Sequence, residues 1–133
     1  MRKLFLTFVT ALLCSIVSFA QSQFGGGDGS ANNPYLISTK AHFEDIKDFA
    51  NQQNGASGKY FKQTADIDLG TFSQYDAIIP TFKGTYDGNG YSITYQASFT
   101  ADNDNVKLGL FGTVTGTIKN LKLTNCSMTC SMT

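Results

Sequence analysis

The 133-residue sequence has no tryptophan, one histidine and two prolines, and Arg2 is its only arginine. Ten basic and ten acidic side chains leave no net charge, and no lysine or arginine cluster follows the first three residues. Because no basic patch is present to attract phosphate, we expect no nucleic-acid partner. The lack of arginine after Arg2 also argues against lyase or phosphate chemistry that needs a guanidinium clamp.

Charged residues make up only 15% of the chain. The uncharged residues Ser, Thr, Asn and Gln fill many of the positions that Lys and Glu occupy in helical proteins. This balance favours β structure, and the length argues for one domain.

The first twenty residues have the pattern of a signal peptide. Arg2 and Lys3 precede a mostly apolar stretch over residues 4–17, and Ser18 and Ala20 are small residues at the two positions that define cleavage. The stretch is shorter than the roughly 20 apolar residues of a spanning helix. We therefore predict a signal peptide over residues 1–20, a secreted or cell-surface protein, and no membrane-spanning segment after cleavage.

Residues 21–33 are rich in Gly, Ser, Asn and Gln and predict a flexible leader. A helix of about 13 to 16 residues is predicted next, from the N-cap candidates Ser38 and Thr39 to a stop at Gly55. Its apolar side chains recur at helical spacing, at Phe43, Ile46, Phe49 and Ala50.

From Gly58 onward the hydrophobic pattern alternates, which predicts strands with one buried face. The segment Asp87-Gly88-Asn89-Gly90 predicts a tight turn, either in a hairpin or at a corner between strands of different sheets. Blocks over residues 60–69, 82–95 and 106–125 start roughly 22 to 24 residues apart, a spacing that suggests a solenoid.

Few side chains suggest reactive chemistry. Asp66 and Asp68 should project from the same strand face about 7 Å apart, which raises a paired-carboxylate or calcium interpretation, but two carboxylates supply too few calcium ligands. His42 is expected to be a solvated helix residue, and residues 102–105 (Asp-Asn-Asp-Asn) to be a polar loop. We assign no catalytic, cofactor-binding or metal-binding residue and predict that the chain is not an enzyme.

Cys126 and Cys130 remain after signal cleavage, and an even pair in an exported protein suggests a disulfide. Four residues along a strand span roughly 13 Å, however, so the two can join only if the chain turns between them.

An ordered set of motifs resembles the N-terminal region of bacterial surface proteins that carry the GLUG motif. The set comprises Asn33-Pro34-Tyr35-Leu36-Ile37-Ser38-Thr39, Gly58-Lys59-Tyr60-Phe61-Lys62, Ala65-Asp66-Ile67-Asp68-Leu69, Phe82-Lys83-Gly84-Thr85-Tyr86-Asp87-Gly88-Asn89-Gly90-Tyr91-Ser92-Ile93, and Gly109-Leu110-Phe111-Gly112. The resemblance implies an all-β fold, a right-handed parallel β-helix that begins with one capping α-helix. Residues 34–133 would form this cap and the first coils, incomplete at the C-terminal end.

The resemblance implies an adhesive or surface-display role without a catalytic set. We therefore expect a non-catalytic β-helix module that binds a glycan or a host surface protein, requires no cofactor, and has an open last coil through which copies could self-associate. The alternative is an N-terminal fragment of a β-helix polysaccharide lyase or hydrolase, or of a surface peptidase. Fold analogy alone supports that alternative.

Overall fold

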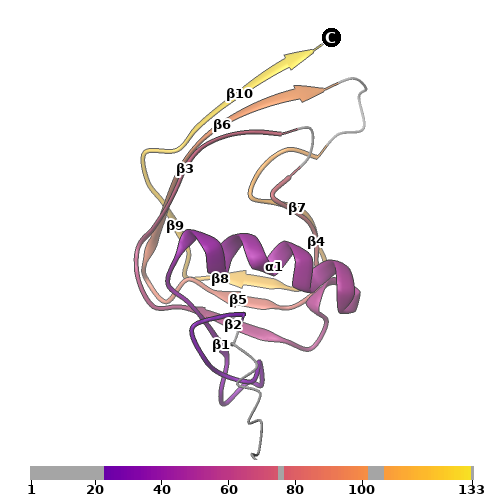
Figure 1. Cartoon of the computed structure of the whole chain (residues 1–133), viewed down its shortest axis with the longest axis vertical. Coiled ribbons are helices and arrows are strands. Elements are labelled where there is room, and N and C mark those ends of the chain that lie inside the picture. Colours follow the sequence, from indigo (N-terminus) through magenta and orange to yellow (C-terminus); the bar gives the residue numbers. More distant parts are fainter. Residues whose placement is uncertain (1–22, 75–76, 102–106, 133) are drawn as a thin grey trace, which may run out of the picture.

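The computed structural model describes residues 23–74, 77–101 and 107–132, which form one α-helix and ten strands in three parallel sheets (Figure 1). The first sheet has the order β1-β2-β5-β8, the second has the order β10-β6-β3 with β9 also paired to β6, and the third pairs β4 with β7. The elements are β1 (Tyr35–Ile37), α1 (Lys40–Gln52), a 3₁₀ turn (Asn54–Ala56), β2 (Tyr60–Gln63), β3 (Ile67–Gln74), β4 (Ile79–Phe82), β5 (Thr85–Asp87), β6 (Ser92–Ala101), β7 (Phe111–Val114), β8 (Thr117–Lys119), β9 (Lys122–Leu123) and β10 (Ser127–Met132).

The predicted fold class, an all-β right-handed parallel β-helix with a capping helix, is wrong. The chain folds as several small parallel sheets of four, four and two strands together with helix α1, which is a mixed α/β arrangement. The helix is part of the core, because Phe43 is fully buried and its ring contacts the rings of Tyr86 and Phe111. The spacing of the sequence blocks reflected recurring corners between short strands, and such corners do not by themselves specify a solenoid.

From β2 to β9, strands that follow one another along the chain lie in different sheets. Parallel strands cannot be joined by a tight turn, so each strand pairs with one that is distant in sequence, as Tyr35 does with Phe61 and Thr85 with Thr117. The segment from Asp87 to Gly90 leads from β5 in the first sheet to β6 in the second, with Asn89 and Gly90 at φ values of 51° and 81°. The corner interpretation is therefore confirmed, and the hairpin interpretation is wrong.

The predicted helix is confirmed in its position along the chain and in the face that it buries. Helix α1 begins after Thr39, whose side-chain oxygen accepts a hydrogen bond from the His42 backbone N–H at 3.1 Å. Phe43, Ile46 and Ala50 are buried, and the helix packs on β1, β3 and β4. Figure 1 shows α1 lying in front of the first sheet, while β3, β6 and β10 rise away from it.

The core runs through all three sheets. Its largest fully buried side chains include Tyr86, Phe61, Phe82 and Phe99, together with Phe43 of the helix. The alternation predicted after Gly58 is confirmed, but it spans two strands, β2 and β3, which belong to different sheets. Gln63 is the one polar side chain fully buried among the described residues.

Residues 23–33 pack against the folded chain, although their composition predicted a flexible leader. Phe24 is buried against Tyr35, Phe49 and Phe61. The Gly25 N–H donates to the Leu36 carbonyl at 2.9 Å, and the Leu36 N–H donates to the Gly26 carbonyl at 3.0 Å. This segment therefore satisfies the outer edge of β1. The buried ring of Phe24 and these backbone hydrogen bonds together hold the polar, glycine-rich segment in place.

Candidate functional site

A shallow groove of about 270 Å³ crosses the outer face of the first sheet. Its lining residues come from the segment before β1 and from β2, β5 and β8: Ala31, Asn32, Pro34, Tyr60, Phe61, Lys62, Thr85, Asp87 and Lys119. Because side chains alternate along a strand, Phe61 and Tyr86 point into the core and their neighbours point outward. The groove therefore presents mainly the polar side chains of β2, β5 and β8.

Strand register arranges the outward side chains in two rows. Tyr60 pairs with Thr85, and Lys62 pairs with Asp87, which pairs in turn with Lys119. Adjacent strands lie about 4.8 Å apart, so the backbone positions of the two lysines flank that of Asp87 at nearly equal spacing. Tyr60 is 37% exposed, which leaves much of its ring available on this face.

Asp87 is held by two hydrogen-bond donors and one ion pair. Its Oδ1 accepts from the Asn89 N–H at 2.8 Å and from Asn120 Nδ2 at 3.0 Å, and its Oδ2 lies 3.8 Å from Lys119 Nζ. Partial burial acts to raise the pKa of Asp87, but the hydrogen bonds from Asn120 and Asn89 and the charges of Lys119 and Lys62 outweigh it. The net effect lowers the pKa of Asp87, so its carboxylate is charged. Its oxygens already have partners within the protein.

Asp66 and Asp68 do not form the paired site considered from the sequence. Asp66 Oδ1 accepts from the Ser92 N–H at 2.8 Å and from the Ser92 hydroxyl at 3.1 Å. These two bonds, the backbone one first, lower the pKa of Asp66. Asp68 Oδ1 instead accepts from the Gly70 N–H at 2.8 Å, where Gly70 has φ of 68°. Asp68 thus closes its own corner of the chain, whereas Asp66 links its segment to Ser92 at the start of β6.

The same use of aspartate recurs before β1. Asp28 Oδ1 accepts from the Ser30 N–H at 2.8 Å, and hydrogen bonds from the Ser30 side chain and backbone lower the pKa of Asp28. Across residues 23–74, 77–101 and 107–132, no three His, Cys, Asp or Glu side chains gather as a metal site would require. Asp28, Asp68 and Asp87 each accept a hydrogen bond from the backbone N–H two residues further on, and they thus shape turns.

His42 has a structural contact. Its Nδ1 accepts a hydrogen bond from the Ser38 N–H at 3.2 Å, just before the helix, and the side chain is half-buried. The ring therefore helps to fix the chain entering α1, a role more specific than the solvated residue predicted.

The two cysteines are free and exposed. The Cys126 thiol donates to the carbonyl oxygens of Ile93 at 3.5 Å and Thr124 at 3.4 Å, whereas Cys130 lies within β10 opposite Phe99. The chain does not turn between them in the way a disulfide would need. The predictions for the signal segment over residues 1–20 and for the loop over residues 102–105 lie outside the described residues.

Sequence reasoning missed two groups of residues. The first group lines the groove, which depends on pairing between strands far apart in sequence. The alternating pattern that places Tyr60, Lys62, Thr85 and Asp87 on the outer face was the sequence signal that could have indicated it. The second group is buried: Gln63 Oε1 accepts from the Tyr86 hydroxyl at 3.0 Å, and its Nε2 donates to the Ala65 and Ser92 carbonyls, each at 2.9 Å. Burial raises the pKa of Tyr86 well above its ordinary value, so this phenol stays a hydrogen-bond donor.

Comparisons with known proteins leave the family open. No family model matches the chain, and no solved structure matches it. A protein of Evansella cellulosilytica named "Putative Gly-rich membrane protein" is 33% identical over 139 aligned residues, which cover 90% of this chain. The chain spans 15% of the length of that relative. In the part of this chain that the structure describes, no helix is long and apolar enough to cross a membrane.

Proposed function

We propose that this chain is a non-catalytic, exported binding module and that it holds a polysaccharide in the groove on the outer face of the first sheet. The observation that carries the proposal is the row structure of the groove, in which Tyr60 and Thr85 lie beside Lys62, Asp87 and Lys119. A sugar ring has apolar faces and a hydroxyl rim. An exposed tyrosine can stack on such a face while lysine and threonine reach the rim.

The charges of the groove favour an acidic polysaccharide. Asp87 already accepts bonds from Asn89 and Asn120 and contacts Lys119. Lys62 contributes a second positive charge close enough to act on Asp87. With one carboxylate between two ammonium groups, the groove is locally positive, and a carboxylated sugar would complete the pairing.

The carboxylates support a binding role over a hydrolytic one. Hydrolysis of a glycosidic bond usually needs two carboxylates about 5 to 9.5 Å apart across the substrate, one of them free to exchange a proton. Asp66, Asp68 and Asp87 are each engaged with backbone N–H groups. The lowered pKa of Asp66 and Asp87 makes both poor proton donors.

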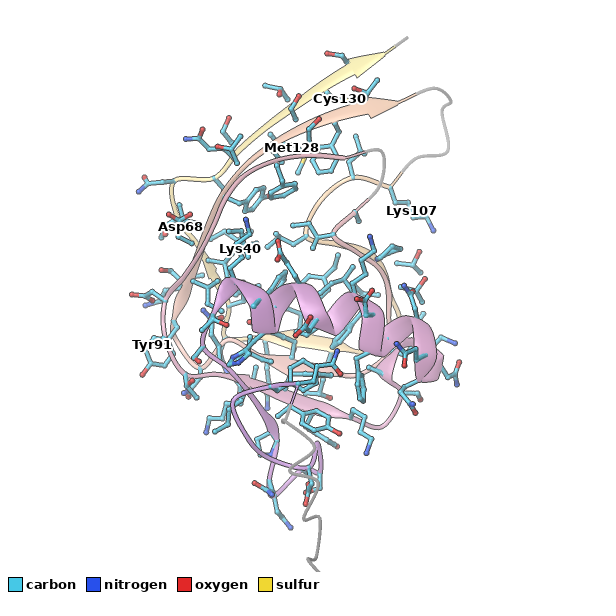
Figure 2. The ribbon with its side chains drawn as sticks, in the orientation of Figure 1. Lys40, Asp68, Tyr91, Lys107, Met128 and Cys130 are labelled. Atoms are coloured by element: carbon cyan, nitrogen blue, oxygen red, sulfur yellow. The ribbon has the colours of Figure 1, made fainter. Side chains whose placement is uncertain are left out.

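Titration calorimetry on a panel of neutral and uronate-containing polysaccharides tests the proposal. We expect Tyr60→Ala to weaken binding by about tenfold. Tyr91→Ala is the matched control, because Tyr91 (labelled in Figure 2) is also 37% exposed but is not among the residues that line the groove. Equal losses for the two variants, or no binding to any member of the panel, would reject the groove as a glycan site.

A second pair of variants tests the preference for acidic sugars. Lys62→Gln should reduce binding to the uronate polymer and leave binding to a neutral one nearly unchanged, and the effect should shrink as salt is added. Lys47→Gln, a half-buried lysine on α1, controls for the loss of one charge. The preference is refuted if both lysine variants lower acidic and neutral binding alike.

A further inference from the structure

The groove on the first sheet runs across the strands, from the segment before β1 to β8. Two outward positions of β2 line it, Tyr60 and Lys62, and two of β5, Thr85 and Asp87. Two residues along a strand span about 7 Å, which sets the width of the groove. Figure 1 shows β2, β5 and β8 one above the other. A long ligand would therefore lie across these strands, in the direction in which they are stacked.

One row of the groove changes its charge from strand to strand. Lys62 is in register with Asp87, and Asp87 is in register with Lys119, so the row is positive, negative and positive. Before it, Leu36 of β1 is in register with Lys62 and carries no charge. With strands about 4.8 Å apart, the backbone positions of the two lysines lie about 9.6 Å from each other. Positive charge thus recurs at every second strand.

The row beside it is uncharged. Tyr60 is in register with Thr85, and Thr85 is in register with Thr117. A ring and two hydroxyls can contact a sugar of either kind, because they carry no charge that would favour or repel an acidic group. Selection by charge therefore falls to the row of Lys62, Asp87 and Lys119.

The central carboxylate limits what can lie between the two lysines. Asp87 Oδ1 accepts hydrogen bonds from the Asn89 N–H and from Asn120 Nδ2. Its Oδ2 lies 3.8 Å from Lys119 Nζ, which is longer than a hydrogen bond. Oδ2 can therefore still accept a hydrogen bond from a neutral hydroxyl. A second carboxylate at the same place would meet a like charge and be repelled.

A polysaccharide matches this row when its acidic and neutral sugars alternate. A sugar ring with its linking oxygen has about the length of one strand spacing, so consecutive sugars can lie over consecutive strands. Acidic sugars over β2 and β8 would then face Lys62 and Lys119, with a neutral sugar over β5. A polymer with a carboxylate on every sugar would place one against Asp87 in any register.

We propose that the groove selects a polysaccharide in which uronate and neutral sugars alternate. The uronates pair with Lys62 and Lys119, and a hydroxyl of the neutral sugar between them donates to Asp87 Oδ2. This inference rests on the proposed glycan-binding function of the groove and adds to it the order of the sugars.

Titration calorimetry of the full chain with two oligosaccharides of equal length tests this order. Hyaluronan oligosaccharides alternate glucuronate with N-acetylglucosamine, whereas oligogalacturonates carry a carboxylate on every sugar. We expect the hyaluronan oligosaccharide to bind at least about fivefold more tightly, although it carries less charge. Equal or tighter binding of the oligogalacturonate overturns the alternation and leaves the glycan-binding function standing. Binding of neither oligosaccharide overturns both.

Removal of the central charge should relax the selection. We expect Asp87→Asn to tighten oligogalacturonate binding by about fivefold, because the repulsion is gone. Hyaluronan binding should change little, which also reports that the groove of this variant is folded. Asp48→Asn, an exposed change on α1, is the matched control for one lost negative charge. An Asp87→Asn chain that keeps the preference of the parent contradicts the proposal.

Removal of the second lysine tests the spacing and leaves the Asp87 carboxylate in place. Lys119→Gln should weaken hyaluronan binding by about fivefold, because one of the two uronates loses its partner. Lys122→Gln is the matched control, because Lys122 is an exposed lysine of β9 that is not among the residues lining the groove. Equal effects of the two substitutions overturn the assignment of a uronate to Lys119.

Discussion

The two ends of the stacked sheets have the same backbone chemistry but differ in how they are covered. At the first end, the edge of β1 bonds to residues 25 and 26, and the ring of Phe24 packs on Tyr35, Phe49 and Phe61. At the last end, β8, β9 and β10 have no strand beyond them among the described residues, and Leu123 is 51% exposed. The difference teaches that apolar residues placed inward are buried only where another layer follows them.

Truncation of one apolar residue at each end gives the largest expected contrast. Phe43→Ala removes a fully buried ring that contacts Tyr86 and Phe111, and it should lower the free energy of unfolding by about 3 to 5 kcal/mol. Leu123→Ala should cost less than about 1 kcal/mol, because half of that side chain is already in water. Urea unfolding monitored by circular dichroism measures both. Similar losses would mean that Leu123 is covered in solution.

Two glycines flanking β5 sharpen the comparison. A Cβ on Gly84 would lie 2.7 Å from the Ala56 carbonyl oxygen, toward the first end. A Cβ on Gly88 would lie 2.6 Å from the Asn120 carbonyl oxygen, toward the last end. Asn120 is exposed and Leu121 is half-buried, so this segment can shift toward solvent. Ala56 is buried and cannot. Gly84→Ala should therefore cost about 1 to 3 kcal/mol and Gly88→Ala less. Thermal unfolding of the two variants gives the order, and the reverse order would show that the last layer is as rigid as the first.

The smallest expected effect is the acid dependence of the contact between Asp87 and the last layer. Because the pKa of Asp87 is lowered from its ordinary 3.8, its contribution to stability is complete above that value and is lost as pH falls through the folded pKa. Asp87→Asn should thus flatten the decline in unfolding free energy between about pH 6 and about pH 2. Asp48→Asn, an exposed helix change, controls for lost charge. An unchanged acid slope in Asp87→Asn would exclude this contribution.

The sequence predicted local features well because their causes are local. Thr39 and the spacing of Phe43, Ile46 and Ala50 located α1, and alternation after Gly58 identified the buried residues Phe61, Ile67 and Leu69. The overall architecture was predicted wrongly, as a β-helix. Turn spacing indicates where strands end, but the number of strands in each sheet depends on packing between distant segments, such as Phe43 with Phe111.

The groove could not be assembled from the sequence for a related reason. Lys62, Asp87 and Lys119 meet because β2, β5 and β8 pair in one register, and a shift of one residue would turn all three inward. The polar, glycine-rich composition of residues 21–33 predicted a flexible leader and did not indicate that Phe24 would be buried.

Parallel pairing also governs when this chain can fold. Among the described strands no pair is joined by a local turn, so Tyr35 must wait for Phe61 and Thr85 for Thr117 before the first hydrogen bonds between strands form. Closing such long loops precedes any gain from packing, which makes folding slow compared with chains rich in local contacts. A polypeptide of this kind can reach its final form only when nearly all of its length is available to fold.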